Sequence, residues 1–199
     1  MNKDKVFKTI DEIPKYLYHG TTSNHINSFK RGIRIDVSRE VSDFGQGFYL
    51  TANYKQAENW AKSIHRSEVY YNGKEFDPVV IKYEMDHNII KNTKTLLFSD
   101  TDNFWAEFIY ANRALKKDLR NNINKNYDFV YGPLADGYRI SLLIRQLDSG
   151  HIDFDSFTKR IQGYKFPFPV DHQMSFHSDR AVKSLELIQF LEVFENAGR

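Results

Sequence analysis

The chain has 199 residues, of which 41% are hydrophobic and 27% charged, an ordinary composition for a soluble globular protein of one domain. It contains no cysteine, which excludes disulfides, thiolate zinc sites and a cysteine nucleophile, and its net charge of +2 is too small to indicate nucleic-acid binding by itself. No apolar run has the length of a signal peptide or a membrane span, so we expect a cytoplasmic protein, with export as an effector left open.

Short β-prone runs recur along the chain, and each is bounded by polar or turn residues, as strands are. They cover 16–18, 47–50, 79–83, 95–98, 127–131, 173–176 and 187–194. The runs do not alternate strictly with helical patterns. The sequence therefore predicts one α+β domain over 1–199, with a mixed sheet and flanking helices, and not a doubly wound α/β fold.

Helical patterns lie between these runs. Ser23 is expected to cap a short helix that ends near Lys30. Apolar residues at helical spacing predict further helices after Tyr54, at 102–115 beginning with Asp102, at 140–150, and at 153–162 beginning with Asp153.

The first strand, "YLYHGTT" (16–22), ends on His19 and Gly20, followed by Thr21 and a second threonine. A histidine beside glycine at a strand end is often structural. The pair also suits the binding of a small ligand between a side chain and a main-chain amide, because glycine permits close approach to the backbone.

A second short strand follows the turn that Gly45 and Gly47 allow. Alternation places Phe48 and Leu50 on one face of this strand and Tyr49 on the other. If Phe48 and Leu50 face the core, Tyr49 faces out, where its ring could stack on a flat ligand in a cleft. If both faces are buried, Tyr49 is part of the core. The segment alone leaves both interpretations open.

These motifs together resemble a known family. "YHGT" and, thirty residues after its His, "GFYLTANYKQAENWA" resemble the first two signature motifs of the ADP-ribosyltransferase superfamily, in its diphtheria-toxin and poly(ADP-ribose)-polymerase branch. The nearer resemblance is to bacterial domains of the DUF3990 type, which share this opening and also carry "W..F...NR", "YD.V.GP.AD" and "Q.SFH" segments. The matching segments here are 105–113, "YDFVYGPLADG" (127–137) and "HQMSFHSDRAVKSL" (172–185). The resemblance implies an ADP-ribosyltransferase-like split sheet with a core at about 16–194.

The resemblance also implies roles in NAD binding for the first two motifs. His19 would hydrogen-bond the 2′-hydroxyl of the nicotinamide ribose. Gly20, with Thr21 beside it in the motif, would hold the carboxamide through its backbone. Tyr49 would stack on the nicotinamide ring.

Trp60 falls where the family has a second stacking aromatic, eleven residues after the tyrosine. Its helical spacing also places it on the stripe of Ala57 and Ile64, so a core position is the competing interpretation.

The third element of the family is a glutamate on a later strand, and the best match here is Gln173. A carboxylate can stabilise the oxocarbenium-like ribose that loss of nicotinamide leaves. A glutamine can orient a group through its carbonyl oxygen, but it has no charge and cannot act as a base. The departure argues against polymer elongation, and it leaves single-unit transfer, NAD cleavage or no catalysis.

Other charged residues could complete such a site. Asp136, after a predicted strand and a Gly-Pro turn, could supply a carboxylate or could simply cap the next helix. Asp171 is another acid near Gln173. Arg113 could hold the NAD pyrophosphate through paired hydrogen bonds, and a structural salt bridge is the alternative.

The sequence thus predicts a mono-ADP-ribosyltransferase that uses NAD as co-substrate without a metal, with His19, Tyr49, Gln173 and Asp136 as candidate catalytic residues. Its acceptor would be a protein or a nucleic acid. The resemblance implies a toxin or effector role with a cognate antitoxin. The alternatives are an NAD glycohydrolase, a non-catalytic module that binds NAD, ADP-ribose or a partner protein, and an RNA-binding domain that uses the basic run 113–125.

Overall fold

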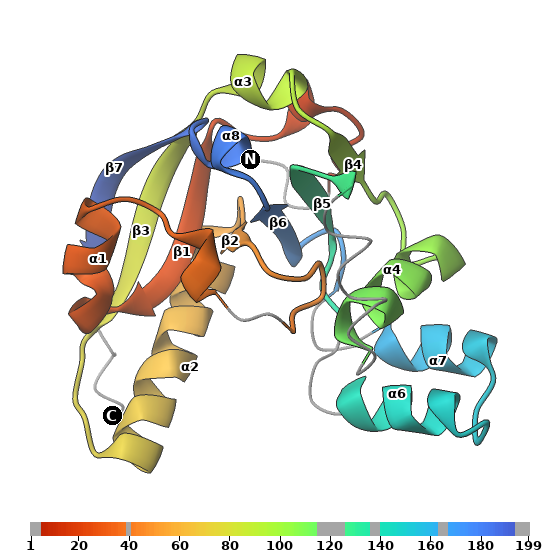
Figure 1. Ribbon diagram of the computed structural model, residues 1–199. Helices are drawn as coiled ribbons and strands as arrows, with labels where there is room; N and C mark the ends of the chain where they lie inside the picture. The colour runs from red at the N-terminus through yellow and green to blue at the C-terminus, as the bar shows by residue number, and fades with distance from the viewer. Residues whose placement is uncertain (1–4, 39–40, 115–125, 136–139, 163–166, 194–199) are drawn as a thin grey trace.

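The computed structural model describes residues 5–38, 41–114, 126–135, 140–162 and 167–193, and its strands form two sheets (Figure 1). The first is antiparallel, with the order β1 (Tyr16–Thr22), β3 (Pro78–Met85) and β7 (Leu185–Glu192). The second has the order β2 (Phe48–Leu50), β6 (His172–Phe176), β5 (Phe129–Pro133) and β4 (Thr95–Leu97). It is a mixed sheet, because β4 and β5 run parallel while the other neighbours are antiparallel. The predicted α+β class is confirmed.

Helices connect these strands. They are α1 (Ile26–Lys30), α2 (Tyr54–Asn72), α3 (His87–Lys91), α4 (Asn103–Arg113), α6 (Ile140–Asp148), α7 (Phe154–Ile161) and α8 (Asp179–Val182), with 3-10 turns η1 (Ile10–Glu12), η2 (Ser23–His25) and η3 (Ile35–Val37). Side-chain oxygens of Asn53, Asp102 and Asp153 accept backbone N–H groups at the starts of α2, α4 and α7. The predicted starts at Asp102 and Asp153 are confirmed.

The predicted cap at Ser23 is wrong. Ser23 begins the turn η2, and the α-helix starts only at Ile26. The reason is that the backbone N–H of Ser23 donates to Asp77 O at 2.9 Å, so this residue still belongs to the end of the antiparallel sheet.

The strand predicted at 127–131 is displaced along the chain. It begins at Phe129 and runs through Pro133. Pairing with β6 decides this boundary, because Gly132 lies opposite Gln173 in the register. Gly132 and Pro133 are therefore the last two residues of the strand, although the sequence suggested a turn at this pair.

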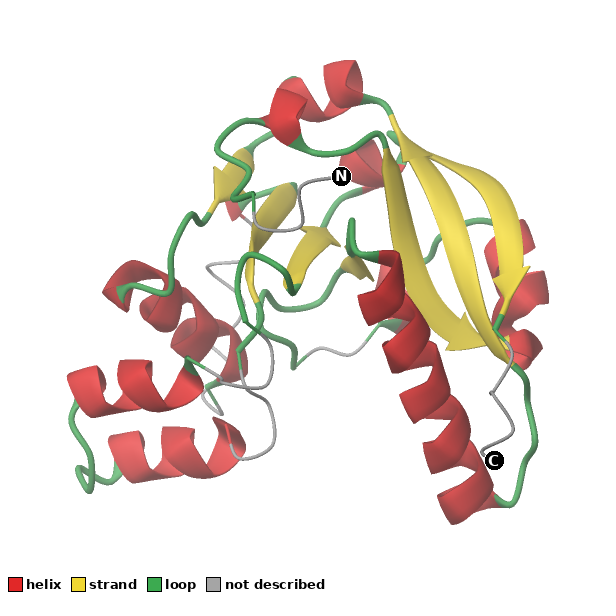
Figure 2. Ribbon diagram, turned by 180° about the vertical axis from the view of Figure 1, so that it is seen from behind, coloured by secondary structure: helices red, strands yellow, loops and turns green. Residues whose placement is uncertain are grey.

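The two sheets share a core, and helices cover their other faces (Figures 1 and 2). On the antiparallel sheet α2 packs through Ala57 and Ala61 beside Val80. The mixed sheet is covered by α4, α6 and α7 around a second apolar cluster. Main-chain bonds between Tyr18 and Thr51, at 2.8 and 3.0 Å, join β1 to the end of β2. This bridge places β1, β2 and β6 side by side.

The alternation of β2 and β6 decides which side chains enter the core between the sheets. Phe48 and Leu50 lie in that core, as one of the two interpretations required. Tyr49 lies opposite Ser175 in the register, and both point to the helix-covered face. Gln173, two residues before Ser175, shares this face.

Gly20 allows α2 to lie directly against β1. A Cβ atom at Gly20 would lie 2.1 Å from Ala57 O and 2.9 Å from Ala61 N, which are both backbone atoms of α2. Packing by itself therefore requires glycine at this position.

Some predicted features fall outside the described residues, namely Leu115, Asp136 and most of the basic run 113–125. In the ranges that the structure covers, no helix combines the length and apolar character needed to cross a membrane.

Candidate functional site

His19 connects the two sheets. Its Nδ1 lies 2.8 Å from the carbonyl oxygen of Tyr49, and its half-buried ring packs between Phe29 and Phe48. Burial lowers the pKa of His19 to about 4, so the ring is neutral at pH 7. A carbonyl can only accept, which places the ring proton on Nδ1 and leaves Nε2 as a hydrogen-bond acceptor.

Tyr49 is half-buried, and its hydroxyl holds the turn before β2. The hydroxyl donates to Gly45 O at 2.7 Å and accepts from the backbone N–H of Phe44 at 3.1 Å. Burial raises the pKa of the Tyr49 hydroxyl, so it keeps its proton for this bond. The ring packs beside the apolar cluster under α4. Tyr49 therefore both supports the turn and keeps part of its surface accessible to a ligand.

Gln173 is buried on β6 and donates both protons of its amide. Its Nε2 lies 2.9 Å from Asp43 Oδ2 and 3.1 Å from Pro133 O. Because a carboxylate and a carbonyl offer no proton in return, the NH₂ group must face them, and Oε1 points the opposite way. The amide is thus held in one orientation, and the group that holds it is a carboxylate from the turn before β2.

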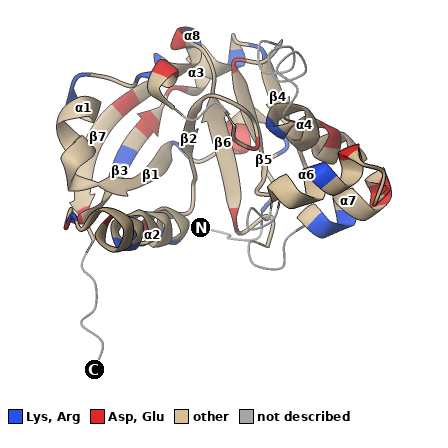
Figure 3. Cartoon of the chain, turned by 60° about the horizontal axis from the view of Figure 1, so that its bottom comes forward, with Lys and Arg blue, Asp and Glu red and all other residues tan. Residues whose placement is uncertain are grey.

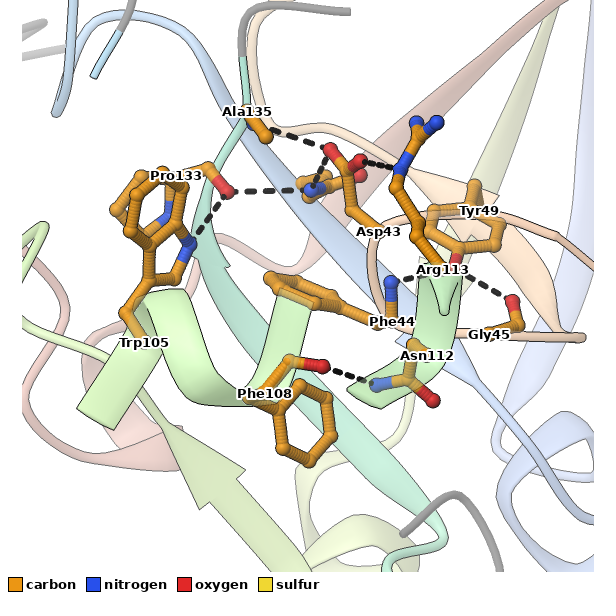
Figure 4. Close-up of polar contacts among 11 residues, drawn as sticks. Asp43, Phe44, Gly45, Tyr49, Trp105, Phe108, Asn112, Arg113, Pro133 and Ala135 are labelled. Carbon is orange, nitrogen blue, oxygen red and sulfur yellow. Dashed lines mark hydrogen bonds and ion pairs between the residues drawn. The ribbon is translucent and has the colours of Figure 1, made fainter. Parts of the chain in front are cut away.

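Asp43 gathers donors from three segments of the chain. Arg113 Nε lies 2.6 Å from Oδ1, and the backbone N–H of Ala135 donates to Oδ2 at 3.0 Å, beside the Gln173 bond. The Asp43 side chain is 7% exposed and that of Arg113 is 20% exposed. Figure 4 shows the terminal nitrogens of Arg113 directed away from Asp43. The ion pair is shielded at the Asp43 end and open at the Arg113 end.

The carbonyl of Pro133 is the second acceptor shared at this place. It accepts from Gln173 and, at 3.3 Å, from Nε1 of the fully buried Trp105 on α4 (Figure 4). Three segments that carry the resemblance, 105–113, 127–137 and 172–185, therefore each contribute a residue to one set of contacts. We name the set formed by Asp43, Arg113, Gln173 and the Pro133 carbonyl the Asp43 junction.

Asp43 was missed in the sequence, although it stands in the conspicuous stretch "DFGQGFYL". An aspartate two residues before Gly45 ordinarily indicates turn formation. Its contact with Gln173 spans a sequence separation of 130, and no local pattern marks such a pair. The signal that could have indicated it was indirect, namely a glutamine where the ADP-ribosyltransferase resemblance implies a glutamate.

Two other predicted ligand contacts are not brought to this place. Thr21 is buried in β1. Trp60 is 57% exposed on α2, so the competing interpretation, a core position, is wrong, and among the described residues no ring contact or hydrogen bond joins it to Tyr49. The reason is that α2 contacts β1 through Ala57 and Ala61, whose small side chains bring the backbones together and leave Trp60 beside the interface.

The structure describes one of the two carboxylates considered as substitutes for glutamate. Asp136 lies outside the described residues. Asp171 is half-buried, its backbone N–H donates to Pro167 O at 2.9 Å, and burial raises the pKa of its carboxyl. The carboxylate in contact with Gln173 is Asp43.

A second polar network fixes the start of β6 next to the site. His172 is buried, its Nε2 accepts from the backbone N–H of Ala52 at 3.0 Å, and its Nδ1 donates to Pro169 O at 3.0 Å. Gln56 on α2 bonds the backbone N–H and C=O of His172, at 3.2 and 2.9 Å. The network requires a neutral ring, and it ties α2 to the strand that carries Gln173.

This network predicts that the protein loses stability in mild acid. Burial lowers the pKa of His172 to about 4, below the ordinary value of 6.5, so between these values the unfolded chain binds a proton that the folded chain excludes. The free energy of unfolding should therefore fall as pH drops from 6.5, by about 2 kcal/mol at pH 5 from His172 alone. Urea denaturation from pH 7.5 to 5 measures it. A His172→Asn variant should show a shallower slope, while the exposed His25→Ala should keep the slope; a flat profile in the unchanged protein contradicts the prediction.

A groove of about 540 Å³ opens near the turn before β2. It is lined by Ile33, Arg34, Ile35, Asp36, Gln46, His177, Ser178 and Asp179. None of the predicted site residues that the structure describes lines it. In the described ranges, no three His, Asp or Glu side chains are grouped so as to hold a metal ion.

Comparison with known proteins gives one match. The model of a family described as "Protein of unknown function (DUF3990)" matches residues 16–187. No curated protein and no solved structure matches the chain.

Proposed function

We infer that this chain, which belongs to the DUF3990 family, is an NAD-dependent mono-ADP-ribosyltransferase that works without a metal. The observation that carries the proposal is the placement of His19, Tyr49 and Gln173 on three neighbouring strands. Strand β1 is bridged to the end of β2, and β2 pairs with β6. The three residues of the resemblance thus lie on neighbouring strands although they are far apart in sequence. The ring of His19 packs on Phe48 at the core between the sheets, and Tyr49 and Gln173 share the opposite face.

The backbone of Gly20 supports a carboxamide site next to Tyr49. Continuing the antiparallel register of the Tyr18–Thr51 bridge by two residues sets Gly20 opposite Tyr49. Main-chain groups two residues apart point the same way, so the N–H and C=O of Gly20 face the β2 side, as those of Tyr18 do. One donor and one acceptor at this edge complement the carboxamide of nicotinamide, whose ring would then lie against the tyrosine.

The protonation of His19 supports the ribose contact. With Nδ1–H bound to the Tyr49 carbonyl, Nε2 offers a lone pair, and among the described residues no group occupies it. Such a fixed, neutral acceptor suits a ribose hydroxyl, which donates a proton to it.

In the proposed reaction the bond between the nicotinamide nitrogen and ribose C1′ breaks, and neutral nicotinamide leaves. An acceptor nucleophile then bonds C1′ and loses its proton. Gln173 would orient a hydroxyl through Oε1 but cannot take that proton, which must pass to another group or to water. The terminal nitrogens of Arg113 would hold the pyrophosphate. The acceptor, a protein or a nucleic acid, and a toxin role with an antitoxin rest on the sequence resemblance alone.

Incubation with NAD tests the proposal. The protein is mixed with a cell lysate and with NAD labelled in its adenylate part, and both the label on macromolecules and free nicotinamide are measured. We expect both products, and we expect His19→Ala to reduce their rates by about 10²-fold or more, as loss of one oriented polar group in a site does. The exposed His25→Ala is the matched control and should keep the full rate. Activity that His19→Ala leaves unchanged, or no product at all, would overturn the proposal.

The glutamine at position 173 also favours a second candidate, a module that binds NAD or ADP-ribose without turnover. The same experiment separates it, because calorimetric NAD binding without nicotinamide release indicates such a module. Release without label transfer indicates a glycohydrolase. For the RNA-binding alternative, most of the basic run lies outside the described residues, and Figure 3 shows charges of both signs on α6 and α7.

A further inference from the structure

We propose that Asp43 is the positioning residue of the site, whose carboxylate fixes Gln173 with Oε1 toward the ligand and Arg113 with its terminal nitrogens toward the ligand. The ligand chemistry that this arrangement fits is a sugar hydroxyl next to a phosphate. The inference rests on the proposed function. It assigns to Asp43 the carboxylate that the resemblance implies at position 173, where this chain has a glutamine.

The contacts of Gln173 carry the first step. Its two amide protons are used by Asp43 Oδ2 and Pro133 O, at 2.9 and 3.1 Å. No described residue donates to Oε1. A half-turn of the amide would bring Oε1, itself an acceptor, against the two acceptor oxygens of Asp43 and Pro133, so this orientation is excluded. Gln173 therefore presents only an acceptor on its other side, as one oxygen of a carboxylate would.

The contacts of Arg113 carry the second step. Asp43 binds Nε alone, at 2.6 Å, and no other described residue is bonded to the paired donors at the end of the guanidinium, so we assign them to another anion. Figure 4 shows these nitrogens directed away from Asp43. The buried carboxylate of Asp43 thus orients the amide oxygen of Gln173 on β6 and the paired terminal N–H groups of Arg113 on α4.

The same geometry gives a physical reason for glutamine at position 173. A glutamate there would put a second carboxylate within hydrogen-bond distance of Asp43, where Arg113 Nε is the cationic group in contact. Two carboxylates at this separation repel each other, and one of them is held protonated. Two carboxylates therefore cannot coexist at this place at neutral pH without a loss of stability.

A double-mutant cycle with Gln173→Glu and Asp43→Asn tests the inference. At pH 7 Gln173→Glu should lower the urea midpoint strongly in the wild-type background and much less in the Asp43→Asn background. Asp43→Asn by itself is expected to lower stability, because an amide has one acceptor oxygen where the carboxylate has two. The stability of the double variant is therefore compared with that of Asp43→Asn and not with that of the wild type. The urea midpoints of all four proteins in the cycle are measured at pH 7 and at pH 5. Relative to wild type, Gln173→Glu should regain stability at pH 5, because the raised pKa of one carboxylate lets it bind a proton, and the double variant, whose glutamate faces no second carboxylate, should regain less.

NAD binding supplies the readout that a purely structural role would not change. In variants shown to be folded by circular dichroism, Asp43→Asn should weaken calorimetric NAD binding by about tenfold or more, which corresponds to one lost hydrogen bond. Gln173→Glu should bind NAD better at pH 5 than at pH 7, relative to wild type.

Two outcomes overturn the inference. The first is that the stability losses of Gln173→Glu and Asp43→Asn simply add in the double variant, and the second is that Asp43→Asn binds NAD as tightly as wild type. If the wild type itself does not bind NAD, the proposed function fails, and the cycle alone then decides whether Asp43 positions Gln173. If Asp43→Asn does not fold, the pH dependence of Gln173→Glu decides; equal destabilisation at pH 7 and pH 5 contradicts the inference.

Discussion

Replacing Gly20 with alanine is expected to lower the free energy of unfolding by about 3 kcal/mol or more, at the upper end of what overpacking costs. The added Cβ would lie 2.1 Å from Ala57 O and 2.9 Å from Ala61 N. Both atoms belong to the backbone of α2, so no side-chain rotation can relieve the overlap. The helix would have to move away from β1 and expose its apolar face. Urea denaturation measures the loss.

Gly73→Ala is the matched control for this variant. Gly73 ends α2 with φ of 62°, and a Cβ there would meet no atom within 4 Å. Its replacement should cost only the left-handed backbone strain, about 1–2 kcal/mol. If Gly20→Ala is as stable as wild type, then α2 does not pack on β1 as described. The comparison also separates packing from ligand binding, because the stability of the unliganded protein does not depend on a carboxamide site.

Replacing Trp105 with alanine is expected to cost about 3–5 kcal/mol, since it removes a fully buried indole and leaves a large cavity under the mixed sheet. The same change removes the Nε1 bond to Pro133 O, the carbonyl that also accepts from Gln173. We therefore expect weaker NAD binding as well as lower stability. Chemical denaturation followed by circular dichroism measures the stability, and calorimetry measures the binding.

Two variants separate the contributions to this effect. Trp105→Phe keeps most of the apolar volume and loses the hydrogen bond, so it should cost about 1 kcal/mol beyond the change in volume. Trp60→Ala removes the other tryptophan, which is 57% exposed, and should change stability by less than about 0.5 kcal/mol. Equal effects of Trp105→Ala and Trp60→Ala would contradict the burial on which the prediction depends.

The Asp43 junction changes how the departure from the ADP-ribosyltransferase pattern that the sequence resembles is understood. Gln173 stands where that resemblance implies a carboxylate. In the structure the carboxylate lies one hydrogen bond away, on a different segment, and is paired with Arg113. The two alternatives considered for Arg113, a salt bridge and a phosphate contact, are compatible, because the salt bridge uses Nε and leaves the terminal nitrogens for a ligand.

Tyr49 likewise combines the two interpretations that the sequence left open. The sequence offered a ligand platform or a core residue for Tyr49. Its hydroxyl holds the turn through Gly45 and Phe44, while the side chain keeps partial exposure. The turn in question contains Asp43, so Tyr49 also supports the residue that orients Gln173.

The sequence by itself determined the features that depend on neighbours along the chain. Alternation put Phe48 and Leu50 on one face of the strand and Tyr49 on the other, and side-chain caps at Asp102 and Asp153 fixed two helix starts. Recurring short strands between helices determined the α+β class. The family match over 16–187 follows from motifs that are themselves local in sequence.

Only the tertiary structure decided which distant groups meet. Asp43 pairs with Gln173 and Arg113 because the turn before β2, the end of α4 and the strand β6 are packed together, and no local period encodes such contacts. Trp60 shows the same limit in the opposite sense. Its spacing fitted a buried stripe, but small residues set the approach of α2 to β1 and left it exposed. Periodicity tells which side chains share a face, whereas packing between elements decides what that face touches.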